Sequence, residues 1–306
     1  MLNFKGKKRV DKSDSKEEPE TGKRKAQVLA VWGSPGCGKT TISVKIAKYL
    51  AEKKKNVILV ISDMTVPMIP CICPMDELEN IWSLGNVLAA PHITKGLIEE
   101  NCIVHKKIKY LAMLGMLRGE NEYTYAPYEA EQALEFLAGL RELSSYIIID
   151  CGSYIANDIL SAVALMEADA VLQMVNCDLK SISYLASQLP LLQEPKWKVE
   201  RHLKAINNIK GQEAINHMEQ VLGKVSFQIP SASEVTEQGM AGNLLAGLEG
   251  KKSRGFNNEI ERIVKEVYGC QGKEKREEYL TKAEILNGAH GCRNLCRHRR
   301  PRQSQL

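Results

Sequence analysis

The chain has 306 residues, of which 44% are hydrophobic and 26% are charged, and its formal net charge is +5. This composition is typical of a globular protein, and an α/β domain of about 250 residues fits within the length. It argues against a membrane-spanning or secreted protein, because no apolar run approaches the ~20 residues that cross a bilayer and no signal-peptide core begins the chain. A cytoplasmic location is expected.

The positive charge belongs to the two ends of the chain. Residues 1–25 hold nine Lys and Arg against five Asp and Glu, and residues 271–306 hold nine against four. Both ends are predicted to be disordered, whereas residues 26–270 form one folded domain with a net charge near −4. This domain lacks the charge footprint of a nucleic-acid-binding protein, although the basic tails can attract nucleic acid or anionic lipid.

The nine cysteines lack the spacing of a disulfide framework, which suits a reducing compartment. Cys71 and Cys73 lie in a Pro- and Met-rich loop and are predicted to pack rather than to bind metal. A further group of metal-ligand types lies in the Arg-rich tail and fits known zinc-finger spacings poorly. Its members are His290, Cys292, Cys296 and His298.

Residues 33–40 are GSPGCGKT and match the phosphate-binding P-loop pattern G-x-x-x-x-G-K-[ST] at every fixed position. An apolar run at 27–32 predicts a strand before the loop, and helical spacing of apolar residues at 41–51 predicts a helix after it. Backbone N–H groups and the helix dipole then face a phosphate, Lys39 contacts the β- and γ-phosphates, and the Thr40 hydroxyl binds Mg²⁺. The predicted nucleotide-binding residues are Gly33, Ser34, Pro35, Gly36, Cys37, Gly38, Lys39, Thr40 and Thr41.

Strands and helices are predicted to alternate along the rest of the chain. The predicted strands are 57–62, 146–150, 170–175, 204–207 and 225–229, and the predicted helices are 128–143, 155–166, 181–192, 211–222 and 256–267. Prolines divide residues 64–118 into loops and short helices. The alternation predicts an α/β fold of the P-loop NTPase type, with a doubly wound, mostly parallel sheet between two layers of helices.

Two acids stand at the carboxyl ends of predicted strands, where sheets of this kind bind ligands. Asp150 follows three isoleucines and has the form of a Walker B acid, which holds Mg²⁺, usually through a bound water. Asp63 follows strand 57–62. Either acid can instead be a turn or helix N-cap residue. Lys39, Asp63 and Asp150 are the predicted catalytic residues, and Thr40 and Asp150 are the predicted Mg²⁺ ligands.

The order of these motifs resembles the ParA/MinD family of ATPases across about residues 26–268. The segments that carry the resemblance are GCGKTT at 36–41, the strand ending at Asp63, YIIID at 146–150, ADAVLQMVN at 168–176, AIN at 205–207 and FQIP at 227–230. The resemblance implies that Asn207 contacts adenine and that Pro230 lies at the nucleotide site. The implied cofactors are ATP and Mg²⁺.

The resemblance also implies ATP-dependent dimerisation, slow hydrolysis, and positioning of another structure on a membrane or nucleoid surface. Within the family, the chain is similar to the CpaE/TadZ branch, which places pilus or secretion machinery. The implied partners are a second copy of the chain and a protein of a pilus, secretion or DNA-partition system. Peripheral location at the inner face of the membrane is part of this expectation.

Two positions depart from the family pattern. Members carry a lysine two residues before the position of Gly36, which reaches the partner's phosphates across the dimer, and this chain has Ser34 there. The second family acid, which orients the attacking water, falls on Thr65 when Asp63 is aligned with the first. Because a threonine cannot take a proton from water at neutral pH, little intrinsic turnover is expected.

Other interpretations stay open. An AAA+ type ATPase predicts a glutamate directly after the Walker B acid, where this chain has Cys151, and a small-molecule kinase predicts an arginine-bearing lid, which residues 64–74 lack. A nucleotide-gated scaffold that binds ATP without useful hydrolysis agrees with both departures. Residues 64–74 are either a partner surface or a core plug. The apolar stripe of helix 256–267 is predicted to face the core rather than a membrane.

Overall fold

The structure is a computed structural model that describes residues 26–211 and 213–269. Both predicted tails, 1–25 and 271–306, lie outside the described residues. The same holds for the Cys- and His-containing group at 290–298 and for the basic segment Arg293–Arg302.

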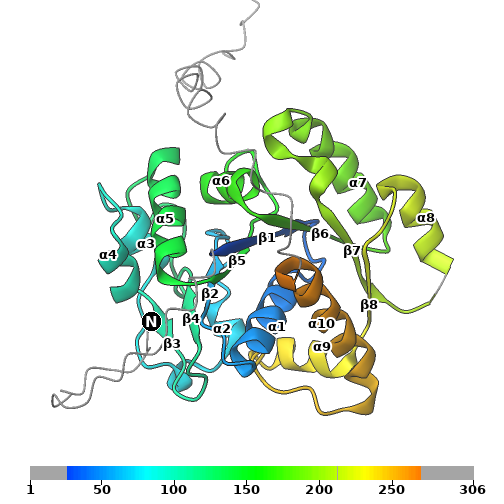
Figure 1. The fold of residues 1–306 in the computed structure, drawn as a ribbon, viewed down its shortest axis with the longest axis horizontal. Coiled ribbons are helices and arrows are strands. Elements are labelled where there is room, and N and C mark those ends of the chain that lie inside the picture. The colour runs from blue at the N-terminus through cyan, green and yellow to red at the C-terminus, as the bar shows by residue number, and fades with distance from the viewer. Residues whose placement is uncertain (1–25, 212, 270–306) are drawn as a thin grey trace, which may run out of the picture. The chain divides into compact units, whose positions relative to one another are not determined.

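An eight-stranded sheet forms the centre of the domain, in the order β3-β4-β2-β5-β1-β6-β7-β8 (Figure 1). The strands are β1 (Gln27–Gly33), β2 (Val57–Ile61), β3 (Ile103–Val104), β4 (Leu111–Leu114), β5 (Tyr146–Asp150), β6 (Ala170–Asn176), β7 (Leu203–Ile209) and β8 (Phe227–Pro230). Neighbouring strands pair in parallel, except that β3 is antiparallel to β4. The helical connections between strands permit this parallel order, since a parallel pair cannot be joined by a tight turn.

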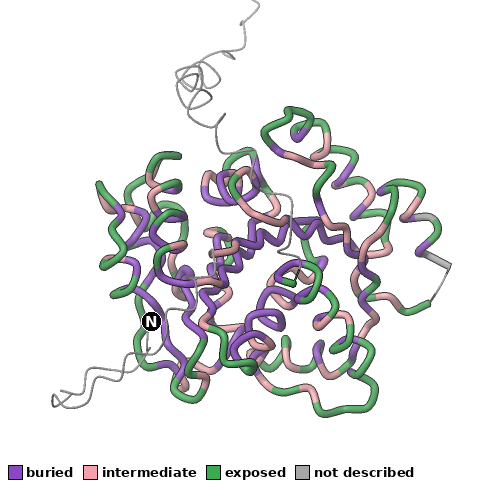
Figure 2. Tube along the Cα trace, in the orientation of Figure 1, coloured by how far each residue is buried: buried purple, intermediate pink, exposed green. Residues whose placement is uncertain are grey.

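Helices cover both faces of the sheet, because successive strand residues point to opposite sides and both sides are apolar. In β1, Leu29 and Val31 pack on one side and Val28, Ala30 and Trp32 on the other. The first side is covered by α1 (Lys39–Glu52), α2 (Ile69–Ile72), α9 (Ser233–Met240) and α10 (Arg254–Gly269). The second is covered by α3 (Leu84–Leu88), α4 (Lys95–Glu100), α5 (Ala130–Leu143), α6 (Ile159–Glu167), α7 (Leu179–Gln188) and α8 (Glu213–Leu222) (Figure 1). Figure 2 shows the sheet as the most continuously buried part of the domain.

The predicted fold class is confirmed, but the prediction for residues 64–118 was incomplete. This stretch contains the short helices that were expected and also the strands β3 and β4. The sequence of β4 is LAML, which has no β-branched or aromatic residue and consists of good helix formers. Its strand conformation comes from pairing with β2, a tertiary contact that local sequence does not encode.

The structure distinguishes between the two interpretations of helix 256–267 and of residues 64–74. The apolar stripe of α10 is buried in the core, and its members are Phe256, Ile260, Ile263, Val264 and Val267. The second half of the 64–74 stretch is a core plug, because Ile69, Ile72 and Cys73 are fully buried, whereas Val66 is exposed. Among the described helices, none has the length and hydrophobicity needed to cross a bilayer.

Candidate functional site

The P-loop lies between the carboxyl end of β1 and the first turn of α1, as the sequence predicts. Two glycines are required by its geometry. A Cβ on Gly33 would lie 1.9 Å from the carbonyl oxygen of Met174 in the neighbouring strand β6. Gly38 has a φ of 88°, and a Cβ there would lie 2.5 Å from the Asn207 amide nitrogen. The loop is therefore packed closely against the ends of β6 and β7.

Lys39, the invariant lysine of the pattern, is bonded within the protein. Its Nζ donates to the hydroxyl of Ser153 at 2.6 Å and is 3.5 Å from the carbonyl oxygen of Ser34. The Ser153 hydroxyl donates in turn to the carbonyl of Gly33 at 3.0 Å. Ser153 belongs to the segment that follows β5, and no sequence pattern marked it.

Thr40 and Asp150, the predicted Mg²⁺ ligands, are brought together. The Thr40 hydroxyl donates to Oδ2 of Asp150 at 2.5 Å, and the Ser43 hydroxyl lies 3.4 Å from Oδ1. Asp150 is only 2% exposed, and burial raises its pKa to about 6, against the Thr40 hydrogen bond and the Lys39 charge, which lower it. The negative charge of a buried carboxylate is poorly compensated by hydrogen bonds from neutral hydroxyls, so a hard divalent cation fits here.

This donor set matches the requirements of Mg²⁺, which keeps several waters and takes one or two protein oxygens. Within the described residues, no group of three or more His, Cys, Asp and Glu side chains is placed to hold a metal ion. The remaining ligands would thus have to be water and the oxygens of a bound phosphate. That is the usual arrangement at a P-loop.

Asp63 is close enough for its charge to raise the pKa of Asp150, but its carboxylate closes a turn. Oδ1 of Asp63 accepts from the Thr65 N–H at 2.9 Å, from the Thr65 hydroxyl at 2.5 Å and from the Val66 N–H at 3.3 Å. Asp63 therefore has the geometry of the turn interpretation. Thr65, at the position of the second family acid, is bonded to Asp63.

Two asparagines hold the P-loop from the neighbouring strands. Asn207 Nδ2 donates to the carbonyl of Cys37 at 2.8 Å, and Asn176 Nδ2 to that of Gly36 at 3.3 Å. The two are register partners, with Asn176 at the end of β6 and Asn207 two residues before the end of β7. Asn176 was not predicted as a site residue. The signal that could have identified it is its place at the end of β6, which is similar to the place of Asn207 near the end of β7. Pro230 ends β8, beside Ile209 of β7.

Ser34 faces the interior of the domain. It is fully buried, and its hydroxyl is 2.8 Å from the hydroxyl of Ser181 in the first turn of α7. Ser181 also accepts from the Asn176 N–H at 3.1 Å, and Asp178 caps the helix by accepting from the Ser181 N–H at 2.7 Å. The position where the family carries a lysine is thus occupied by a contact between the P-loop and α7.

A second capped helix supports the other side of the site. Asp158 caps α6 by accepting from the Ser161 N–H at 2.9 Å and from its hydroxyl at 2.5 Å. The Ser161 hydroxyl also accepts from the Gly152 N–H at 2.8 Å and lies 2.7 Å from the Ser62 hydroxyl. Burial raises the pKa of Asp158 to about 6. This network joins the ends of β2 and β5 to α6.

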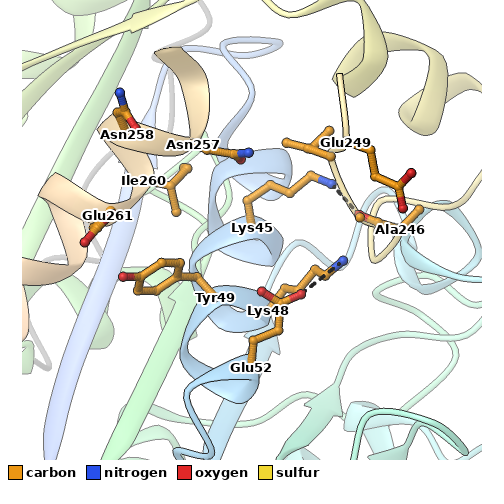
Figure 3. A pocket seen from close by; sticks show the side chains of 12 residues that line it. Lys45, Lys48, Tyr49, Glu52, Ala246, Glu249, Asn257, Asn258, Ile260 and Glu261 are labelled. Atoms are coloured by element: carbon orange, nitrogen blue, oxygen red, sulfur yellow. Dashed lines mark hydrogen bonds and ion pairs between the residues drawn. The ribbon is translucent and has the colours of Figure 1, made fainter. Parts of the chain in front are cut away.

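A separate cavity of about 360 Å³ lies between α1, α10 and residues 246–249 (Figure 3). Lys45 extends from α1 toward this loop, and its Nζ donates to Gln238 Oε1 at 2.5 Å and to the Ala246 carbonyl at 3.1 Å. Burial lowers the pKa of Lys45 to about 8, and the charge of Lys48 acts in the same direction. Lys48 pairs with Glu52 at 3.4 Å. None of the predicted site residues lines this cavity.

Comparisons with known proteins agree with the geometry of the P-loop site. A family model described as an AAA domain matches residues 27–205, which is more than half of the chain. No curated protein has significant sequence similarity to the chain.

Solved structures with the same fold include ParA and MinD proteins. A ParA family ATPase from Chlorobium tepidum TLS is 17% identical, with a TM-score of 0.62 over 78% of this chain and 96% of that one. The septum site-determining protein MinD from Pyrococcus horikoshii OT3, complexed with Mg-ADP, is 18% identical, with a TM-score of 0.61 over 78% and 96%. MinD in a MinC:MinD complex from Aquifex aeolicus is 18% identical, with a TM-score of 0.60 over 82% and 99%. With its P-loop, its sheet order and its family-model match, the chain belongs to the ParA/MinD-type family of P-loop ATPases.

Proposed function

We propose that this protein binds ATP with Mg²⁺ and hydrolyses it slowly, and that the nucleotide state controls the positioning of a larger cellular assembly. The observation that supports this most directly is the meeting of Lys39, Thr40 and Asp150 at the carboxyl edge of the sheet. An ammonium, a hydroxyl and a buried carboxylate at the start of one helix are the groups that a magnesium-bound triphosphate requires.

The proposed roles follow from these positions. Lys39 binds the β- and γ-phosphates, the Thr40 hydroxyl binds Mg²⁺, and Asp150 holds the ion through a bound water. The backbone N–H groups of residues 33–41 surround the phosphates. Asn207 contacts adenine, for which its side-chain oxygen is a suitable acceptor while its Nδ2 holds the loop. Pro230 lies beside the base.

Slow hydrolysis follows from the groups near Asp63. The Thr65 hydroxyl donates to Asp63 and cannot act as a base toward water. Asp63 itself accepts three hydrogen bonds in its turn, so its carboxylate is already engaged. The same observations favour a second candidate, a nucleotide-gated scaffold that binds ATP with negligible hydrolysis.

The proposed partners are a second copy of the chain, when ATP is bound, and a protein of a pilus, secretion or partition system. MinD from Aquifex aeolicus forms a complex with MinC, which supports a protein partner for this chain as well. Placement in the CpaE/TadZ branch is part of this proposal. So is a cytoplasmic protein whose basic tails contact membrane or nucleic acid at the inner face of the membrane.

The first test is thermal unfolding with ATP or ADP, with and without Mg²⁺. Nucleotide at a hundred times its Kd should stabilise the protein by about 2.7 kcal/mol, seen as a rise in Tm. Lys39→Ala and Asp150→Asn should abolish the Mg²⁺-dependent part. Lys48→Ala is the matched control, because Lys48 lies on the same helix away from the P-loop. Absence of any nucleotide-dependent shift would contradict ATP binding.

The second test measures ATP turnover alone and with vesicles, DNA or candidate partner proteins. Turnover should be slow alone and rise with one of these additions. Many turnovers per second by the isolated protein would contradict the slow ATPase. No rise with any addition, together with nucleotide-dependent dimer formation, would favour the scaffold.

A further inference from the structure

The ammonium of Lys39 already has a partner that competes with phosphate. Ser153 accepts from Lys39 Nζ at 2.6 Å and donates to the carbonyl of Gly33 at 3.0 Å. One hydroxyl therefore bridges the first residue of the P-loop and its lysine. A hydroxyl is a neutral acceptor, whereas a phosphate oxygen is charged and forms the stronger bond with an ammonium. A bound phosphate should therefore replace the Ser153 hydroxyl as the hydrogen-bond acceptor of Lys39 Nζ.

Ser153 is in turn held by α7. The hydroxyl of Tyr184 donates to the backbone carbonyl of Ser153. The Tyr184 ring packs against the fully buried ring of Trp32, with the ring centroids 5.9 Å apart. Trp32 directly precedes Gly33, whose carbonyl accepts the hydrogen bond from Ser153. Tyr184 therefore contacts the chain next to both partners of that hydrogen bond.

Helix α7 contacts the P-loop at a second point, one turn earlier. The Ser181 hydroxyl is 2.8 Å from the hydroxyl of Ser34. Ser181 and Tyr184 are three residues apart and lie on the same side of the helix. Helix α7 therefore contacts both the P-loop, through Ser181, and Ser153, which is hydrogen-bonded to Lys39.

On the basis of these contacts, we propose that Ser153 is a positioning residue that keeps Lys39 hydrogen-bonded until phosphate binds. When that hydrogen bond breaks, Tyr184, which is bonded to Ser153, changes the position of α7. This proposal rests on the proposed role of Lys39 in binding phosphate. Tyr154, the neighbour of Ser153, is 61% exposed, so the segment has room to move when the bridge to Lys39 is broken. The N-terminal half of α7 would then differ between the nucleotide-free and nucleotide-bound proteins.

Affinity measurements test the first half of the proposal. Ser153→Ala removes the competing acceptor, so its affinity for ATP should rise roughly threefold to tenfold, the equivalent of one ordinary hydrogen bond. Ser153→Thr keeps the hydroxyl and should keep the wild-type affinity. A fall in affinity in Ser153→Ala that Ser153→Thr restores would overturn the competition, because Ser153 would then assist binding.

Tryptophan fluorescence tests the second half. The chain has three tryptophans, and Trp82→Phe with Trp197→Phe leaves Trp32 as the reporter beside Tyr184. A non-hydrolysable ATP analogue should change Trp32 emission. The change should be lost in Tyr184→Phe, which keeps the ring and removes only the hydroxyl that holds Ser153.

Calorimetry on the same samples separates the outcomes. Binding with an emission change that persists undiminished in Tyr184→Phe would overturn the role of Tyr184, and binding with no emission change would overturn the signal to α7. Both leave the proposed function intact. Absence of binding by calorimetry would overturn the proposed function and this inference together.

Discussion

Asp158→Asn should make the folded protein more stable near neutral pH, although Asp158 caps a helix. Burial raises the pKa of this carboxyl from 3.8 to about 6. The folded protein therefore keeps the proton longer than the unfolded chain does, and its stability falls as the pH rises from about 3.8 to about 6. A difference of about two pKa units corresponds to about 3 kcal/mol, an upper bound because Asp158 is only partly buried.

Asparagine removes this charge and keeps the cap. Its Oδ1 can still accept from the Ser161 N–H, but its Nδ2 cannot accept from the Ser161 hydroxyl, which costs about 1 kcal/mol. The net gain in the variant is about 1–2 kcal/mol above pH 6 and turns into a loss of about 1 kcal/mol below pH 4.

Urea unfolding from about pH 3.5 to about pH 7.5 measures this change, provided the slope with denaturant stays constant. The control is Asp178→Asn, because Asp178 caps α7 with the same D-x-x-S pattern but is exposed. Because the Asp178 side chain is exposed, the argument from burial does not apply to it, and its substitution should not reproduce the pH-dependent gain of Asp158→Asn. If the stability difference for Asp158→Asn stays constant with pH, or equals that of the control, the argument from burial is wrong.

Three further predictions concern other parts of the fold. Gly33→Ala should lower the free energy of unfolding in urea by several kcal/mol, because its Cβ would lie 1.9 Å from the Met174 carbonyl oxygen of β6. Gly36→Ala has open space around its Cβ but a φ of 77°, and should lower it by only about 1 kcal/mol. Equal losses in the two variants would contradict this reasoning. Arg141→Ala should lower the free energy of unfolding by about 2 kcal/mol, since Arg141 pairs with Asp169 at 2.7 Å and bonds two backbone carbonyls; a change below about 0.5 kcal/mol would refute it. Lys45 should make wild-type stability rise between about pH 8 and about pH 10.5, because the folded protein releases this proton earlier than the unfolded chain, and chemical unfolding of Lys45→Met should lack that rise.

The parts of the site that the sequence predicts are those that short segments determine. The P-loop needs one strand, one glycine-containing turn and one helix, all within residues 27–52, and the structure has this arrangement. Asp150 was located for the same reason, because a buried strand that ends in an acid is a local pattern. The family resemblance rested on these and further short segments of the chain, and the family was confirmed by the family-model match over residues 27–205.

The contacts that sequence reasoning missed join segments far apart in the chain. Ser34 meets Ser181 across 147 positions, and Lys39 meets Ser153 across 114. They meet because β1 lies between β5 and β6 in the sheet, an order that no local pattern reveals. The same reason explains β4, whose helix-forming sequence is held as a strand by β2.

The buried contact of Ser34 limits which side chains this position of the P-loop can hold. A lysine at this position would have to place four methylene groups and an ammonium where two hydroxyls lie 2.8 Å apart without solvent. A lysine therefore cannot be accommodated here by Ser34→Lys alone, since α7 would have to move away as well. Ser34 and the first turn of α7 thus form one packing unit, in which a large side chain at position 34 requires a compensating change in α7.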